Sequence, residues 1–360
     1  MLVPLRAFEP ALWTRRTHID RTIVEVETDD GLVGLGETRA LWAAKIVEER
    51  FAPALIGLDA RDRAGAKARC LRHKFDYGFP EQLLDVTAFA GIELALWDLA
   101  GKAAGLPLFR LLGGPVRERA HFCAYGYPPD PSGGVAEAEV PRLMATLAQE
   151  SVARTGASLF EFKIARHGLD CDIRTTHAVR DALGDGVEIA VDPNMAYDLG
   201  QARRYLTETA TARLTNIEEP VAALPQMVEL QSDFGIPIST HCTLLDSLSA
   251  YPSVVGVVFD LHAKGGIGPT LDFIAEVSAL GRQVWLRAAW ELGVSFAAMC
   301  HLAMAAPELE RPSQALMQFP TDDLILGAPW RMSDGGCRPP DSPGLGVDLD
   351  RQALQLYCVS

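Results

Sequence analysis

Clustered positive charge is missing from this sequence. It has 33 Lys and Arg residues against 47 Asp and Glu residues, which gives a formal net charge of −14 at pH 7. Binding to nucleic-acid phosphates or to an anionic membrane needs patches of Lys and Arg, and none stands out along the chain. We therefore expect no nucleic acid and no membrane among the partners.

Long apolar runs and paired cysteines are missing too. No segment approaches the roughly 20 apolar residues that span a bilayer, and the stretch MLVPLRAFEP lacks the unbroken apolar run of a signal peptide. The seven cysteines are scattered without CxxC spacing, and their odd number fits a reducing compartment. We expect a soluble, cytoplasmic protein whose thiols are structural or inert.

Phosphate-binding glycine loops are also absent. Gly113-Gly114 and Gly265-Gly266 are turn glycines without the required spacing, so no nucleotide, flavin or pyridoxal site is indicated. The chain does have a hydrophobic content of 48% over 360 residues. This is enough for a large core, in two domains or in one large barrel with an additional domain.

The first part of the chain has the pattern of a small α+β unit. The segment RTIVEVETDDGLVGLGET contains two β-type runs around Asp29-Asp30-Gly31, which is a strong hairpin signal. The segment from Thr87 to Gly105 repeats apolar residues at helical spacing and stops at a glycine, with Pro107 just beyond. We expect a hairpin followed by helices.

From about Ala120 the pattern changes to short apolar runs separated by helical stretches. Most runs are roughly 20 to 30 residues apart, the repeat of parallel β/α units that close into a barrel. The fold class that follows is α/β, a modified TIM (β/α) barrel with an α+β N-terminal domain. The eight candidate strands are HFCAY, LFEFKI, VEIAVD, LTNIE, IPIST, VVGVVFD, QVWLRA and QALMQF.

Ionisable side chains follow consecutive candidate strands. In a β/α barrel the C-terminal ends of the strands meet at one rim, where the active site is built. So many charged residues in register are hard to explain as ordinary surface, and they predict a functional site. They are Lys163, Asp192, Glu218, His241, Asp260 and Arg287.

Four of these residues suggest metal-assisted proton chemistry. Asp192 and Glu218 offer carboxylate oxygens that suit Mg²⁺, and His241 shifts the preference towards Mn²⁺, Fe²⁺ or Zn²⁺. A neighbouring cation and partial burial favour the neutral amine of Lys163, which would then be a general base. The alternatives are a salt bridge from Glu218 to Lys163 or Arg287, or a lysine that only pairs with the two carboxylates.

Several longer segments together carry a family resemblance. They are VETDDGLVGLGE, GIELALWDLAGKAAGLPLFRLLGG, VDPNMAYDL, IEEP, FDLHAKGG and GVSFAAMCHLAMAAPEL. In them the sequence resembles the enolase superfamily, in its mandelate racemase and muconate lactonizing branch, and in particular the glucarate dehydratase subgroup. The resemblance covers nearly the whole chain. It implies a capping domain over residues 1–118, completed by the tail from roughly 325 to 360, and a catalytic barrel over residues 119–324.

The resemblance also implies a cofactor and a substrate class. Superfamily members use a Lys or His base with Mg²⁺ that stabilises an enediolate. The family's metal ligands fall on Asp192, Glu218 and His241, with Glu219 as a neighbouring acid and Asn194 as a substrate contact. The implied cofactor is Mg²⁺, or Mn²⁺ or another divalent ion because of His241. The implied partner is a small-molecule sugar acid, and a homo-oligomer is the default expectation.

Three positions depart from the family's pattern. Glu161 replaces the first lysine of a common Lys-x-Lys pair, so that Lys163 would hold its proton more firmly. His241 stands where Glu, Asp or Asn is usual, which reduces the affinity for Mg²⁺. Arg287 replaces a catalytic histidine, while its partner Asp260 is kept.

Arg287 cannot exchange a proton as histidine does, because a guanidinium stays protonated. It can hold a substrate carboxylate or stabilise the charge of an enediolate. The alternative is an ion pair with Asp260 that closes a site without chemistry. A two-base racemase is not expected.

Further substrate contacts are expected around the rim. Arg15, Arg16 and His18, in the loop LWTRRTHID, suit a polyanionic sugar acid; the alternative is that each arginine is an ordinary surface cation. Tyr125 could bind a sugar hydroxyl or pack in the core. His262 could serve as an acid or be a structural histidine.

The function that follows is a metal-dependent dehydratase of a sugar acid or diacid. The reaction would be α-proton abstraction, enediolate formation and loss of the β-hydroxyl as water. The proton for the leaving hydroxyl would come from Lys163, His262 or a metal-bound water. The alternatives are a one-base epimerase or cycloisomerase of the same superfamily, or a non-catalytic descendant that binds a sugar acid.

Overall fold

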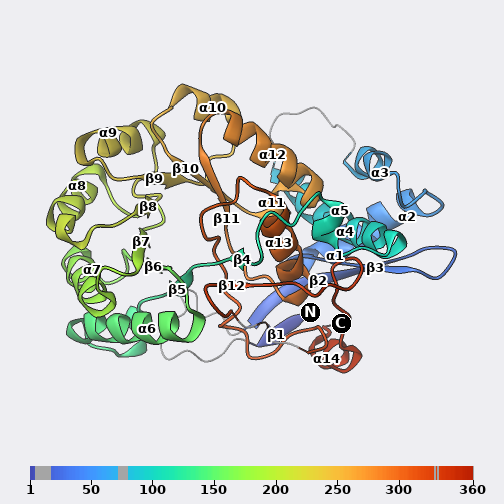
Figure 1. The fold of residues 1–360 in the computed structure, drawn as a ribbon, viewed down its shortest axis with the longest axis horizontal. Coiled ribbons are helices and arrows are strands. Elements are labelled where there is room, and N and C mark those ends of the chain that lie inside the picture. The colour runs from blue at the N-terminus through green and yellow to red at the C-terminus, as the bar shows by residue number, and fades with distance from the viewer. Residues whose placement is uncertain (5–17, 72–79, 328–329, 331, 360) are drawn as a thin grey trace.

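A curled parallel sheet with helices on its outer side lies beside an N-terminal unit of strands and helices (Figure 1). The computed structural model describes residues 1–4, 18–71, 80–327, 330 and 332–359. The sheet has seven strands in the order β11-β10-β9-β8-β7-β6-β5, and every pairing in it is parallel. This confirms the predicted α/β class with a TIM-like sheet and an α+β N-terminal unit.

The strands of this sheet alternate with helices along the chain, as the spacing of the apolar runs predicted. The strands are β5 (Ala124–Gly126), β6 (Leu159–Lys163), β7 (Glu188–Asp192), β8 (Asn216–Glu218), β9 (Ile238–Thr240), β10 (Gly256–Phe259) and β11 (Gln283–Leu286). The helices between and after them are α6 (Val140–Thr155), α7 (Leu169–Leu183), α8 (Leu199–Glu208), α9 (Leu224–Phe234), α10 (Leu245–Ala250), α11 (Leu261–Lys264), α12 (Ile267–Ala279) and α13 (Gly293–Ala305).

The eighth predicted strand is not a strand in the structure. The segment 314–319 forms no ladder, and the chain instead crosses the gap between the two edge strands with single contacts. The Gln314 amide donates to the Leu286 carbonyl at 2.9 Å, and the Cys123 amide donates to the Ser313 carbonyl at 2.9 Å. One extended stretch therefore links β11 to the start of the first barrel strand, and it carries the Gln314 side chain to the interior.

The N-terminal unit is an antiparallel sheet covered by one long helix. Its strands are β1 (Leu2–Pro4), β2 (His18–Glu27) and β3 (Val33–Arg39), and the predicted hairpin turns at Gly31, where φ is +83°. The predicted helix is α4 (Pro80–Ala104). It packs directly on β3, because a Cβ at Gly36 would lie 1.8 Å from the Gly91 carbonyl oxygen of α4. This close approach fixes the position of the end of β3, after Gly36, relative to α4.

Shorter elements complete this unit and join it to the barrel. They are α1 (Trp42–Ile46), η1 (Val47–Phe51), α2 (Ala52–Leu55), α3 (Arg63–Cys70), α5 (Leu108–Leu111), β4 (Ala120–His121), β12 (Gly336–Cys337) and α14 (Arg351–Tyr357). The C-terminal segment returns to the N-terminal unit, where the Asp98 carboxylate of α4 accepts the amides of Leu35 and Leu345 at 2.8 and 2.7 Å.

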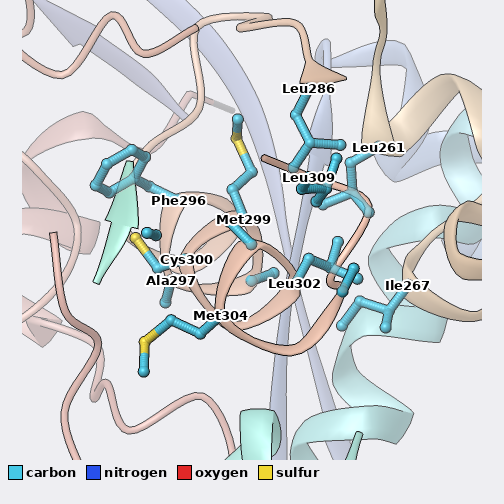
Figure 2. Packing of buried hydrophobic residues seen from close by; sticks show 14 of the residues in the cluster. Leu261, Ile267, Leu286, Phe296, Ala297, Met299, Cys300, Leu302, Met304 and Leu309 are labelled. Carbon is cyan, nitrogen blue, oxygen red and sulfur yellow. The ribbon is translucent and has the colours of Figure 1, made fainter. Parts of the chain in front are cut away.

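Helix α13 is buried on all sides and joins the two parts of the molecule. Every residue from Gly293 to Ala305 is buried, as expected for a helix that is apolar all round. Figure 2 shows Met299 and Leu302 of α13 packed among Leu261, Ile267 and Leu286 of the barrel. None of the helices in the described part of the chain combines the length and apolarity needed to cross a membrane. None of the seven cysteines, all of them within the described residues, forms a disulfide.

Candidate active site

The C-terminal ends of the parallel strands surround one cavity of about 470 Å³. This lies within the roughly 300–1,000 Å³ typical of small-molecule sites. The strand ends and the segments after them line one side, and β2, β3 and the turn into α1 line the other. Its polar and aromatic lining includes Tyr125, Tyr127, Lys163, Asn194, His241, Arg287, Trp290 and Gln314 from the barrel side, and Asp20, Arg21, Arg39 and Trp42 from the N-terminal unit.

Three of the predicted residues form a cluster that can hold a metal ion. One ligand atom each of Asp192, Glu218 and His241 lies within 4.8 Å of the other two. An ion about 2.1 Å from each ligand would place the ligand atoms at most about 4.2 Å apart, so a small contraction suffices. Glu218 Oε1 is buried and lies 3.1 Å from His241 Nε2, so the two groups form a buried pair in the absence of an ion. A divalent ion bound by both groups would take the place of the proton on Nε2.

The ring of His241 is oriented for ligation through Nε2. Its Nδ1 lies 3.0 Å from the Val258 carbonyl oxygen, which can only accept, so Nδ1 carries the hydrogen. Burial alone would lower the pKa of His241, but the adjacent Glu218 carboxylate outweighs it and raises the pKa to about 9. Glu219 holds the backbone here, since its carboxylate accepts from the His241 amide and from Thr240 Oγ1.

The two buried carboxylates differ in their readiness to ionise. Burial and the nearby Glu218 charge raise the pKa of Asp192 to about 7 against the opposing effect of Lys163. In Glu218 the burial effect is outweighed by His241 and Lys163, and the pKa falls to about 2. Hard carboxylate oxygens with a correctly oriented imidazole suit a divalent ion, and the residues present therefore fit one.

Lys163 stands beside this cluster, at the border of the cavity. Its Nζ contacts Asp192 Oδ2 and donates to Asn194 Oδ1 at 2.8 Å. Asn194 has a left-handed backbone with φ +50°, and its amide donates to Asp192 Oδ1 at 2.7 Å. The ion pair from Glu218 to Lys163 or Arg287 considered above is not formed among these described residues. The predicted base is thus adjacent to the predicted metal ligands.

Gln314 is a site residue that sequence reasoning missed. Its Nε2 donates to Glu161 Oε1 at 2.5 Å and to Glu218 Oε2 at 2.9 Å. Burial and the carboxylates of Glu218 and Asp192 raise the pKa of Glu161 well above its usual range. These surroundings favour the neutral acid of Glu161 and so oppose the negative charge expected beside Lys163. The one feature of the sequence that could have indicated it is the amide side chain of Gln314 at the start of a predicted apolar strand.

Asp260 joins two arginines that line the cavity. Its Oδ2 lies 2.8 Å from Arg39 Nη1 and 3.5 Å from Arg287 Nη2. Arg39, at the end of β3, was also missed, because nothing in the local sequence links it to a residue 221 positions later, as 260 − 39 gives. The ion pair between Asp260 and Arg287 considered above exists, but Arg287 still lines the cavity with 32% of its side chain exposed.

The remaining predicted contacts fall in different places. Tyr125 lines the cavity, whereas His18, at the start of β2, is exposed and is not part of the lining. His262 is fully buried behind Asp260, with Nε2 2.8 Å from Ser295 Oγ, and does not border the cavity. Arg15 and Arg16 lie outside the described residues.

A buried ion pair attaches the N-terminal unit to the cavity wall. Arg21 Nε lies 3.0 Å from Glu37 Oε1, and Arg21 also donates to the Ala289 carbonyl. The Glu37 carboxylate accepts the amides of Leu292 and Ser295 at 2.8 and 2.9 Å, which caps the N-terminus of α13. The loop after β11 is therefore held by residues from β2 and β3.

Two family models match the chain. The mandelate racemase / muconate lactonizing enzyme N-terminal domain matches residues 3–113, and the enolase C-terminal domain-like model matches residues 143–353.

Curated relatives include both dehydratases and cycloisomerases. A protein of Streptomyces coelicolor named probable glucarate dehydratase is 28% identical, over 98% of this chain and 89% of its own. The D-galactarolactone cycloisomerase of Agrobacterium fabrum is 30% identical, over 94% of this chain and 91% of its own.

Solved structures share the architecture. An enolase from Streptomyces coelicolor, 29% identical, has a TM-score of 0.88 and covers 99% of this chain and 94% of its own. An enolase from Pseudomonas fluorescens Pf0-1, with bound magnesium, potassium and tartrate, is 25% identical with a TM-score of 0.83 and covers 99% of this chain and 90% of its own.

Proposed function

Because the chain belongs to the mandelate racemase and muconate lactonizing enzyme family of the enolase superfamily, we propose that it is a metal-dependent dehydratase of a sugar acid or diacid. The observation that carries this proposal is the position of Lys163. Its amine borders the cavity and contacts Asp192, directly beside the cluster of Asp192, Glu218 and His241. A base and a cation site next to each other are what α-proton abstraction from a carboxylic acid requires.

Asp192, Glu218 and His241 would hold the divalent ion. Magnesium is bound in the Pseudomonas fluorescens enolase, and the imidazole of His241 adds manganese as a candidate. When bound, the ion supplies Lewis acidity that withdraws electron density from the substrate carboxylate and so acidifies the α-proton. Lys163 and His241 would then no longer compete for the two carboxylates.

Lys163 would carry both proton transfers. Its Nζ takes the α-proton, and the electron pair of the C–H bond forms the enediolate double bond. As the β C–O bond breaks, Lys163 returns this proton to the leaving hydroxyl, which departs as water, and the enol becomes a 2-keto acid. We assign the return to Lys163 because His262 does not border the cavity. Asn194, 2.8 Å from Nζ, would orient the amine.

Arg287 would act through its fixed charge. It stands where glucarate dehydratases carry a catalytic histidine, but a guanidinium does not release its proton. Its contact with Asp260 holds it at the cavity wall. There it would orient an anionic group of the substrate or stabilise developing charge.

A cycloisomerase is the second candidate, supported by the 30% identical D-galactarolactone cycloisomerase. Both reactions can start with the same proton abstraction, so the two activities are distinguished by their products. We would incubate the protein and Mg²⁺ or Mn²⁺ with a panel of aldonic and aldaric acids and their lactones, and follow the products by NMR. A 2-keto acid formed with loss of water supports the dehydratase. Ring opening or isomerisation without loss of water would replace it by the cycloisomerase.

A further inference from the structure

Two arginines from separate parts of the chain meet at one carboxylate oxygen. Arg39 ends β3 of the N-terminal unit, and Arg287 follows β11 of the barrel. Their guanidinium groups lie 2.8 and 3.5 Å from Asp260 Oδ2. Both side chains remain about one third exposed, at 33% and 32%, and both line the cavity.

Asp260 cannot balance both arginines. It carries one negative charge, and its Oδ1 already accepts the amides of His262 and Ala263 at 2.7 and 3.2 Å. Arg287 Nε is buried and has no hydrogen-bond partner within the described part of the chain. The two guanidinium groups together have ten N–H donors, more than one carboxylate can accept. Positive charge and unused donors therefore face the cavity at this point.

Other charges on the lining do not remove this excess. Arg21 is neutralised by its own buried partner, Glu37, at 3.0 Å. Lys163 is paired with an acid of its own, because its Nζ contacts Asp192 Oδ2. Asp20 is the one acid among the described residues that line the cavity, and its removal is part of the test below.

We infer that Arg39 and Arg287 form a subsite for a second anionic group of the substrate, the distal carboxylate of a diacid. This inference rests on the proposed function, in which the α-carboxylate is bound at the Asp192, Glu218 and His241 cluster. A planar fork of N–H donors is suited to bidentate binding of a carboxylate. Arg39 is then a specificity residue supplied by the N-terminal unit, which distinguishes an aldarate from an aldonate.

The test compares matched ligand pairs by isothermal titration calorimetry in the presence of Mg²⁺. Glucarate and gluconate, galactarate and galactonate, and mannarate and mannonate differ within each pair only in the distal carboxylate. We expect the full chain to bind at least one aldarate ten-fold or more tightly than its aldonate. In Arg39→Met the preference should fall below three-fold, whereas Arg39→Lys should keep part of it.

Two further variants test whether the aldarate preference depends on charges that line the cavity or on charged residues elsewhere in the protein. Arg50→Met removes an arginine that pairs with Asp85 at 2.6 Å and does not line the cavity, and it should leave the preference unchanged. Asp20→Asn removes an acid from the lining and should maintain or increase the preference. The thermal unfolding temperature of each variant verifies folding.

Three results would overturn the subsite: no aldarate binds, none is preferred over its aldonate, or Arg39→Met weakens both members of a pair equally. A separate measurement, α-proton exchange in D₂O, tests the dehydratase proposal. If the Arg39-dependent preference is present but no acid exchanges its α-proton, the subsite stands and the dehydratase fails. If an aldonate is dehydrated as efficiently as its aldarate, the dehydratase stands and the subsite fails.

Discussion

The Nδ1 atom of His241 lies 3.0 Å from the carbonyl oxygen of Val258, and this contact decides which ring nitrogen faces the acidic cluster. A carbonyl oxygen only accepts, so the hydrogen sits on Nδ1 and Nε2 points at Glu218. Metal-binding histidines are commonly fixed in this way by a second hydrogen bond. A residue type unusual for this family position is thus held in the orientation that ligation needs.

Metal binding should release a proton and strengthen as the pH rises. Glu218 raises the pKa of His241 to about 9, so His241 is protonated at neutral pH when no ion is bound. The ion must displace this proton, and the apparent affinity should therefore rise about tenfold per pH unit between pH 7 and 8. Calorimetry with Mn²⁺ in buffers of different ionisation enthalpy measures the proton release. An affinity independent of pH, without proton release, would count against His241 as a ligand.

Gln314 should support the metal site without touching the ion. Gln314→Met removes the donor that bridges Glu161 and Glu218, and loss of such a support typically lowers metal affinity by about 10- to 100-fold. Gln318→Met is the matched control, because that amide donates at 3.4 Å to the carbonyl oxygen of Tyr125 instead. The affinities of the two variants for Mn²⁺ are measured by calorimetry. Equal affinities in the two variants would show that the bridge has no role in metal binding.

The ion pair of Arg21 and Glu37 should matter more for stability than a similar pair at the surface. Both of its side chains are nearly or fully buried, at 2% and 0% exposure. Glu37→Gln leaves a buried guanidinium unpaired and should lower the free energy of unfolding by about 3–5 kcal/mol. Glu25→Gln breaks the exposed pair with Arg351 and should cost about 0–1 kcal/mol. Urea unfolding measures both, and similar losses would contradict the assignment.

His301 should make the fold sensitive to acid. It is fully buried, accepts the Phe109 amide at Nδ1 and donates to the Leu345 carbonyl, both at 3.1 Å. Burial lowers its pKa to about 4, while the unfolded chain takes up a proton near pH 6.5. Its contribution is complete above pH 6.5 and is lost as the pH falls towards 4, by about 3 kcal/mol in total.

The variant His301→Gln, which can make the same two hydrogen bonds, isolates this contribution. The difference in unfolding free energy between wild type and variant should shrink by that amount between pH 7 and pH 4. His121→Gln, at an exposed position in β4, should show no such change. A difference between wild type and His301→Gln that stays constant with pH would remove His301 as the acid-sensitive group.

Much of the barrel could be predicted because its strands are local apolar runs at a regular spacing. The hairpin around Gly31 and the helix ending before Gly105 were equally local signals. The segment 314–319 was wrongly predicted as a strand because it is apolar. In the structure its place in the barrel is filled by contacts of Ser313 and Gln314 with both edge strands, and such long-range pairing leaves no pattern in the sequence.

The residues of the candidate site likewise fall into those that local sequence patterns predict and those that depend on long-range contacts. Lys163, Asp192, Glu218 and His241 could be found because parallel strands bring their C-terminal ends to one rim. Arg39 could not, since its partner Asp260 belongs to the other part of the molecule. Glu161 was identified, but its raised pKa follows from burial among carboxylates, which depends on the assembled barrel.

The most direct test of the account is α-deuterium exchange in D₂O, comparing wild type with Lys163→Met on every acid that calorimetry shows to bind. We expect exchange and 2-keto product with wild type, an exchange rate at least about 10²-fold lower in the variant, and Mn²⁺ binding that the variant retains. Exchange that persists in Lys163→Met would show that another group is the base. If wild type binds metal and acid but never exchanges the α-proton, the dehydratase account fails.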